Sequence, residues 1–184
     1  MKQESNVRYI LRLALTLLAI CAVVSGLLAG VNAITKDRIA AIKAEKTAKA
    51  VSAVLENGAS AVEIPYDAES NPMVTKVYKN EIGYAVQVSP AGFDGPITMM
   101  VGIVDGKVTG ISVISHTETP GLGAVAGADS AKGEAFRGQF LGLVSGIVVD
   151  GEENSIDSMS GATITSKAVT AGVNAALEFV ANLG

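Results

Sequence analysis

Residues 97–116 read ITMMVGIVDGKVTGISVISH, and this stretch decides the fold. Two apolar runs flank the pair Asp105-Gly106, which is a strong signal for a two-residue turn between antiparallel strands. An earlier stretch, MVTKVYKNEIGYAVQVS at residues 73–89, alternates apolar and polar residues around a turn region at 79–83. The sequence therefore predicts four consecutive antiparallel strands between residues 73 and 115.

The C-terminal segment contains the clearest helical pattern. Its apolar stripe recurs at helical spacing, at Val169, Val173, Ala176, Leu177 and Val180. We expect Thr165 or Ser166 to cap the start of this helix. A short helix around residues 130–137 and a strand around residues 146–149 are also expected. Together these elements predict an α+β fold, in which helices pack on an antiparallel sheet.

The N-terminal region contains a candidate membrane helix. Residues 13–34 form an apolar run without a charged side chain, between Arg12 and Lys36. At 1.5 Å per residue, such a helix is long enough to span a hydrocarbon core of about 30 Å. A cleaved signal peptide is the alternative, because residues 31–33 resemble a cleavage site. More basic residues follow the run than precede it, so the bare charge count points the C-terminal domain toward the cytoplasm. Long domains translocate largely regardless of flanking charge, so the count alone leaves the orientation open.

Three regions are predicted along the chain. Residues 1–35 form an N-terminal segment with the transmembrane helix. Residues 36–58 are rich in alanine and lysine, so we expect a helical stalk that ends at Gly58. Residues 59–184 form the folded domain.

The composition argues against several kinds of function. Cys21 and His116 are the sole cysteine and histidine of the chain, which excludes an internal disulfide and a metal site built from several such ligands. We therefore predict no metal site. From residue 50 onward, 6 basic side chains stand against 15 acidic ones. Such a surface repels phosphate backbones, so no nucleic-acid partner is expected.

Hydroxyl side chains gather in SMSGATITSKAV, residues 158–169, where the last helix begins. Ser160 and Thr163 flank a Gly-Ala pair, and Thr165 and Ser166 follow. A helix N-terminus attracts anions because it presents unpaired amides and a partial positive charge. The segment is therefore either a pocket for a phosphate or carboxylate or an ordinary helix cap, and the residues alone leave both open.

Two motifs resemble one known family. DSMSGATITS at residues 157–166 resembles the flavinylation motif of the FMN-binding domain that is shared by the G subunit of Rnf electron-transport complexes and the C subunit of the sodium-pumping NADH:quinone oxidoreductase. HTETPGLGA at residues 116–124 resembles a second motif of that family, which lies beside the flavin. Residues 92–113 also have the family's pattern. The likeness covers nearly the whole chain, and the chain's short length makes it more similar to the Rnf protein.

The resemblance implies that FMN is bound covalently, through a phosphoester to Thr163. A separate magnesium-dependent flavin transferase would attach it with FAD as the donor, and Asp157 belongs to the recognition motif. Around the acceptor the resemblance places Ser160, Gly161, Ala162 and Thr165. Beside the isoalloxazine ring it places Glu118, Thr119, Gly121, Leu122 and Gly123. No catalytic residue is expected in the chain itself, because the chemistry belongs to the cofactor.

The resemblance also implies the role of the whole chain. It would be a single-pass protein of the cell (inner) membrane that relays electrons within an ion-translocating ferredoxin:NAD oxidoreductase, as a non-autonomous part of a translocase complex. Its partners would be the lipid bilayer and other Rnf subunits, including membrane and iron–sulfur subunits. The FMN domain would lie on the extracytoplasmic side, against the bare charge count. The alternatives are the C subunit of the quinone reductase and a membrane-anchored anion-binding module without redox function.

Overall fold

The computed structural model describes residues 2–67 and 71–183, with side chains from residue 7 onward. Two compact units make up the chain, residues 1–44 and residues 45–184. Helix α1 (Lys2–Val54) begins in the first unit and ends in the second. The region limits predicted at residues 35 and 58 stay predictions.

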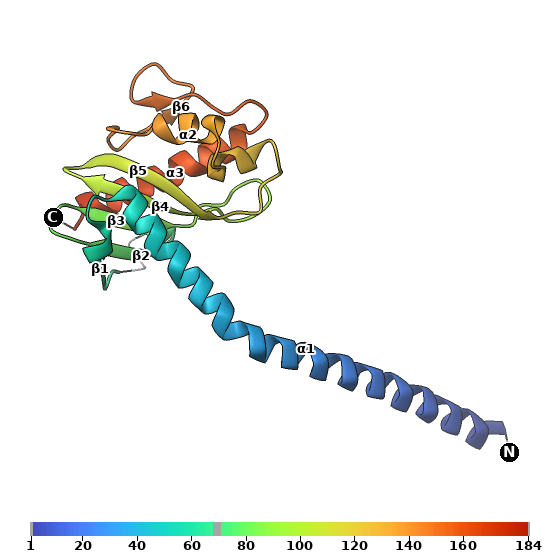
Figure 1. Cartoon of the computed structure of the whole chain (residues 1–184). Helices are drawn as coiled ribbons and strands as arrows, with labels where there is room; N and C mark the ends of the chain where they lie inside the picture. The colour runs from blue at the N-terminus through green and yellow to red at the C-terminus, as the bar shows by residue number, and fades with distance from the viewer. Residues whose placement is uncertain (1, 68–70, 184) are drawn as a thin grey trace. The chain divides into compact units, whose positions relative to one another are not determined.

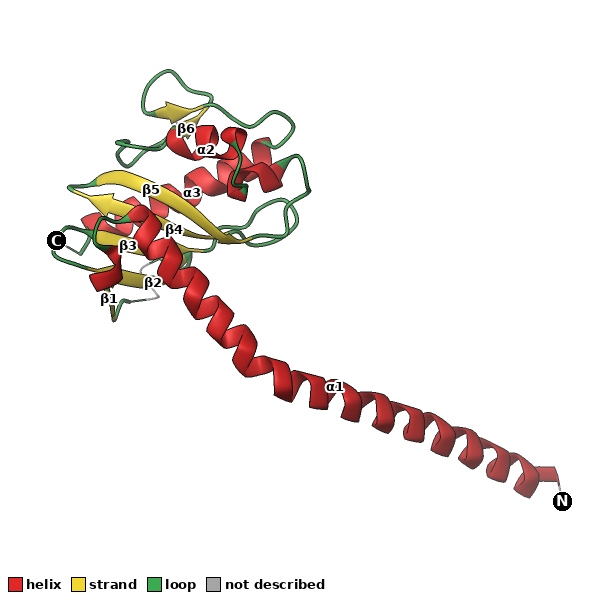
Figure 2. Cartoon of the chain, viewed as in Figure 1, coloured by secondary structure: helices red, strands yellow, loops and turns green. Residues whose placement is uncertain are grey.

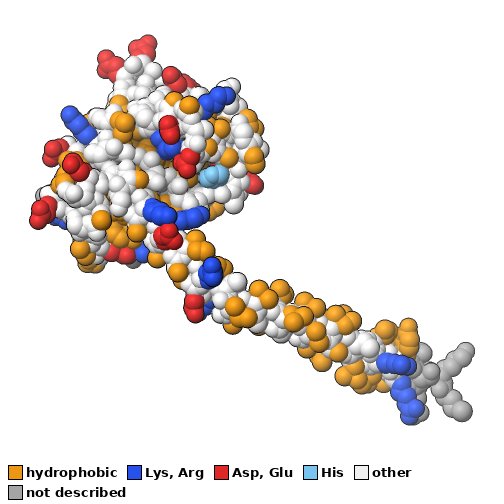
Figure 3. Space-filling view, viewed as in Figure 1, with side chains coloured by type: hydrophobic (Ala, Val, Ile, Leu, Met, Phe, Trp, Pro, Cys, Tyr) orange, Lys and Arg blue, Asp and Glu red, His pale blue; other side chains and the backbone are white. Residues whose placement is uncertain are grey.

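Helix α1 is long and apolar over much of its length. Among the described residues it is the one helix that is long and apolar enough to cross a membrane, with a mean hydropathy of 2.4 in a window that is not buried at all. The apolar run predicted at residues 13–34 lies inside this helix, and hydrophobic side chains cover its surface in Figure 3. Length and composition therefore suit this helix to span a bilayer.

The second unit contains a five-stranded antiparallel sheet with its strands in sequence order (Figure 1). The strands are β1 (Val62–Ile64), β2 (Val74–Lys79), β3 (Tyr84–Val88), β4 (Thr98–Val104) and β5 (Lys107–Ser115). The four predicted strands are confirmed, and Asp105 and Gly106 form the β4–β5 turn with φ angles of 52° and 71°. Strand β1 was not predicted, because three residues are too few for an alternating pattern.

Both faces of the sheet are covered by helices. On one face lies α3 (Thr163–Ala181), whose predicted stripe packs on the core that contains Met99, Val101 and Ile103 of β4. On the other face the end of α1 packs against Met100 and Ala85. Strand β4 is buried on both sides, which explains why it reads as a continuous apolar run.

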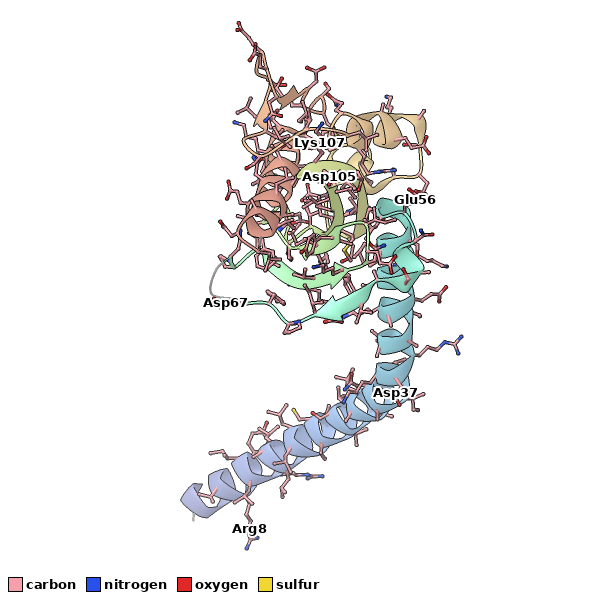
Figure 4. The ribbon with its side chains drawn as sticks, turned by 90° about the vertical axis from the view of Figure 1, so that its left-hand side faces the viewer. Arg8, Asp37, Glu56, Asp67, Asp105 and Lys107 are labelled. Carbon is pink, nitrogen blue, oxygen red and sulfur yellow. The ribbon has the colours of Figure 1, made fainter. Side chains whose placement is uncertain are left out.

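Close backbone contacts fasten the end of α1 to the sheet. The Thr109 hydroxyl donates a hydrogen bond of 2.6 Å to the Val54 carbonyl, and the Asn80 amide donates one of 2.9 Å to the Glu56 carbonyl. A Cβ atom at Gly102 would overlap the Val54 carbonyl oxygen. The first hydrogen bond satisfies a carbonyl that the helix end leaves unpaired, and the second holds the residue pair that follows the helix. Figure 4 labels Glu56 just beyond the end of the helix.

Smaller elements complete the unit (Figure 2). They are η1 (Gly58–Ser60), η2 (Gly123–Gly127), α2 (Ala131–Gly138), β6 (Val148–Val149) and β7 (Ser155–Ile156), and the last two pair in parallel. The predicted short helix is confirmed as α2, with Ser130 as its N-cap. The strand predicted near residues 146–149 is confirmed as the two-residue β6. Segments η2 and β7 were not predicted. The predicted α+β class is confirmed.

The close approach at Gly102 predicts a specific loss of stability. Gly102→Ala pushes a Cβ into the end of α1, so we expect the free energy of unfolding to fall by about 1–3 kcal/mol, as for other overpacked sites. Denaturant titration of the detergent-solubilised full chain measures this, and hydrogen exchange at residues 50–55 should speed up. Gly138→Ala is the matched control, because nothing lies within 4 Å of its Cβ position. An equal effect of the two substitutions would contradict the prediction.

Candidate functional site

Three segments of the second unit enclose a pocket of about 360 Å³. The loop before β4 contributes Phe93. The segment after β5 contributes Glu118, Thr119, Leu122 and Gly123. The start of α3 and the two residues before it contribute Gly161, Ala162, Thr163, Ile164 and Thr165. The structure thus brings the two motifs singled out in the sequence to one place.

Three residues predicted for the site lie outside the lining of this pocket. Asp157 and Ser160 are exposed on the segment that leads into α3, and Gly121 is exposed in a turn with a φ of 78°. Two residues that were not predicted, Phe93 and Ile164, do line it. Phe93 could have been singled out only as an unexplained aromatic residue within a Gly-rich stretch.

Glu118 lies at the point where the three segments meet. Its side chain is 5% exposed. One carboxylate oxygen accepts hydrogen bonds from the backbone amides of Phe93 (2.8 Å) and Asp94 (3.4 Å), and the other accepts one from the Thr165 hydroxyl (2.5 Å). The carboxylate therefore joins the loop before β4 to the first turn of α3.

The loop and the η2 segment can approach Glu118 because glycines face it. A Cβ atom at Gly92 would overlap one carboxylate oxygen. A Cβ atom at Gly123 would overlap the other carboxylate oxygen and the Thr165 hydroxyl oxygen. Real Cβ atoms essentially never come this close, so a side chain at either position would force the bonded Glu118 carboxylate to shift.

The start of α3 carries no side-chain cap, and the predicted capping by Thr165 or Ser166 is wrong. Ala162 is the N-cap residue and makes no side-chain capping bond. The Thr165 hydroxyl is bonded to Glu118, while the Ser166 hydroxyl accepts from the Met159 amide and donates to the Ala162 carbonyl. No side chain caps the first amides of α3, so the positive end of the helix is available to an anion beside the exposed Thr163.

Side chains from other elements hold the segment that precedes α3. The Asp157 amide donates to the Gln139 side chain and the Ser158 amide donates to Asp150, each at 2.7 Å. The hydrogen bond from the Ser158 amide is the main reason why the pKa of Asp150 is lowered, with a smaller contribution from Lys167. Gln139 and Asp150 were not predicted, because nothing in the local sequence marks a polar residue as the partner of a distant backbone amide.

No group of three or more metal-ligating side chains that could hold a metal ion occurs among the described residues. Glu118 is the one charged side chain among the pocket's lining residues within the described ranges. The arrangement thus offers an open helix N-terminus, an exposed hydroxyl and an apolar-rimmed pocket. This combination suits a ligand that has both an anionic group and a flat apolar part.

Comparison with known proteins decides the family. Residues 1–54 match the RnfG N-terminal region, and residues 92–178 match the FMN-binding domain. The G subunit of the sodium-translocating ferredoxin:NAD oxidoreductase complex of Acetobacterium woodii is 31% identical over 99% of this chain and 97% of its own length. This chain belongs to the family of Rnf G subunits. The apolar helix and the family together indicate a membrane anchor.

Two relatives from other organisms agree with this family. The G subunit of the proton-translocating complex of Clostridium ljungdahlii is 43% identical over 54% of each chain, and that of the ion-translocating oxidoreductase complex of Methanosarcina acetivorans is 31% identical over 96% of this chain and 97% of its own length. Among solved structures, the C subunit of the sodium-translocating NADH-quinone reductase from Parabacteroides distasonis is similar with a TM-score of 0.45 and 21% identity, covering 64% of this chain and 71% of that chain.

The Asp150–Ser158 contact predicts a pH-dependent stability difference. Because the pKa of Asp150 is held below its ordinary value of 3.8, the ionised carboxylate stabilises the fold above that value, and this contribution is lost as the pH falls through the folded pKa. Asp150→Asn removes it. We expect the Tm of the variant to lie below wild type near neutral pH and the gap to close at a pH below 3.8.

The control for this experiment is Glu152→Gln, which removes one exposed carboxylate from the same β6–β7 connection. Its Tm should follow wild type across the titration. A gap between wild type and Asp150→Asn that stays constant down to the acid limit would contradict the electrostatic explanation.

Proposed function

We propose that this chain carries FMN as a phosphoester on Thr163 and relays electrons within an Rnf-type ion-translocating ferredoxin:NAD oxidoreductase. The observation that carries the proposal is the exposed Thr163 hydroxyl, which stands at the uncapped N-terminus of α3 and on the wall of the pocket. The match of residues 92–178 to the FMN-binding domain includes every residue that lines this pocket.

The residues of the pocket fit the two parts of FMN. A phosphate on Thr163 would lie beside the free amides of the first turn of α3, where the helix dipole favours negative charge. The rim of the pocket exposes large apolar surfaces, with Phe93 at 66% and Ile164 at 56% exposure, and Leu122 is also exposed. Exposed apolar groups around a cavity of this size are typical of a site for a flat aromatic ligand.

The attachment needs help from outside the chain. A threonine hydroxyl is a weak nucleophile without a base, and the one charged side chain on the pocket wall within the described ranges, Glu118, is already bonded to Thr165. We therefore assign activation to a magnesium-dependent flavin transferase. The Thr163 oxygen forms a bond to the FMN phosphorus of FAD, the bond to AMP breaks, and the hydroxyl proton leaves to the transferase.

The electron-transfer role follows from the cofactor and the relatives. Bound FMN supplies the ability to accept two electrons and to release them singly. The relatives are named as parts of sodium- and proton-translocating ferredoxin:NAD oxidoreductases, which supports an Rnf complex with membrane and iron–sulfur subunits over the quinone reductase. We assign ion transport to the partner subunits, and we place the FMN domain on the extracytoplasmic side.

Mass spectrometry tests the attachment. The full chain is produced together with the flavin transferase and digested with trypsin. We expect the peptide that contains Thr163 to carry the mass of FMN less one water, and denaturing gels to show flavin fluorescence. Thr163→Val should abolish both, whereas Thr163→Ser keeps a hydroxyl and should retain them in part or in full. An unmodified wild-type peptide would refute the proposed cofactor linkage.

The sidedness is tested with reporters fused after the last residue. Alkaline phosphatase folds into an active enzyme outside the cytoplasm, and green fluorescent protein serves as the reciprocal reporter of the cytoplasm. We expect the phosphatase fusion to be active and the fluorescent fusion to be dark. The reverse pair of results would place the FMN domain in the cytoplasm.

A further inference from the structure

The buried carboxylate of Glu118 carries a charge that no cation on the pocket wall balances. Its hydrogen-bond donors are two backbone amides and the Thr165 hydroxyl, all of which are neutral. No lysine or arginine occurs among the lining residues in the part of the chain that the structure describes. Both carboxylate oxygens accept, which is the pattern of an ionised group.

Three neutral donors thus surround a carboxylate that is 5% exposed. Hydrogen bonds donated to a carboxylate stabilise its negative charge. They leave the negative charge itself in place, and at a site that is buried from solvent its field is weakly screened. Glu118 therefore contributes a negative potential to the pocket, opposite in sign to the contribution from the start of α3.

We infer that Glu118 is a positioning residue that builds the pocket and, through its charge, holds the reduction potential of the flavin low. The inference rests on the proposed function. Reduction adds negative charge to an isoalloxazine ring, and a nearby carboxylate makes that addition less favourable. Glu118 acts on the ring through this charge, while its oxygens accept hydrogen bonds from Phe93, Asp94 and Thr165.

The substitution Glu118→Gln separates the charge from the packing. Glutamine keeps the length of the side chain, an oxygen that can accept from the Phe93 amide, and an amide that can donate to the Thr165 oxygen. The matched control is Glu178→Gln, because Glu178 is an exposed carboxylate on the same helix that carries Thr165, and its loss changes the net charge of the chain equally.

Spectroelectrochemical titration of the flavin-loaded full chain provides the main measurement. We expect Glu118→Gln to shift the midpoint potential in the positive direction, while Glu178→Gln stays at the wild-type value. Glu118→Asp keeps the charge and changes the geometry, so its potential should lie closer to wild type than that of Glu118→Gln. Equal potentials for Glu118→Gln and Glu178→Gln would overturn the inference.

The positioning role has a readout that needs no flavin. In the unmodified Thr163→Val background, Glu118→Ala leaves the Phe93 amide and the Thr165 hydroxyl without a partner, so it should lower the Tm more than Glu118→Gln does. Equal Tm values for these two variants would refute the positioning role.

A second variant covers the case in which Glu118→Gln is not loaded with flavin. Thr119 is exposed on the same pocket wall, and Thr119→Lys adds a cation there while Glu118 remains. Its midpoint potential must exceed that of Thr119→Gln, and the absence of such a rise would count against the electrostatic inference. Failure of the proposed function is distinguishable from both results, because it appears as wild-type protein without attached flavin.

Discussion

The Glu118 carboxylate holds three separate segments of the chain at one point, and the pocket exists because they meet there. The sheet makes this meeting possible. Thr98 at the start of β4 pairs with Ser115 at the end of β5. The loop before β4 and the segment after β5 therefore lie at the same end of this strand pair. Glu118 then bonds the loop on one side and Thr165 of α3 on the other. Gly92 and Gly123 are glycines because the carboxylate leaves no room for a side chain.

Much of the fold could be predicted from the sequence where a pattern is long and local. The Asp105-Gly106 turn, the two hairpins and the apolar stripe of α3 all follow from periodicity and turn chemistry. The missed elements are short and depend on partners. Strand β1 has three residues and exists through its pairing with β2, and β7 has two residues that pair in parallel with β6. No single-sequence pattern marks segments of that length.

The candidate site could likewise be predicted only in part. The resemblance identified the motif residues on both sides of the pocket, but it could not give the contacts between them. Glu118, which was expected beside the ring, lines the pocket, and its oxygens are also bonded inside the protein. Gln139 and Asp150, which hold the backbone of residues 157 and 158, lie outside both motifs. Such bonds between distant side chains and backbone amides arise only once the tertiary structure has formed, and they leave no trace in local sequence.

The incorrect cap prediction shows how the site departs from local rules for a physical reason. A serine or threonine at the start of a helix normally bonds the first amides, and a bound anion would then have to compete with it. In this chain Glu118 engages Thr165, Met159 engages Ser166, and alanine occupies the N-cap position. Both hydroxyls that were expected to cover the amides thus have other partners, while Thr163 stays exposed. The helix gives up a stabilising cap, and in exchange its positive end remains available at the residue that we propose to be esterified.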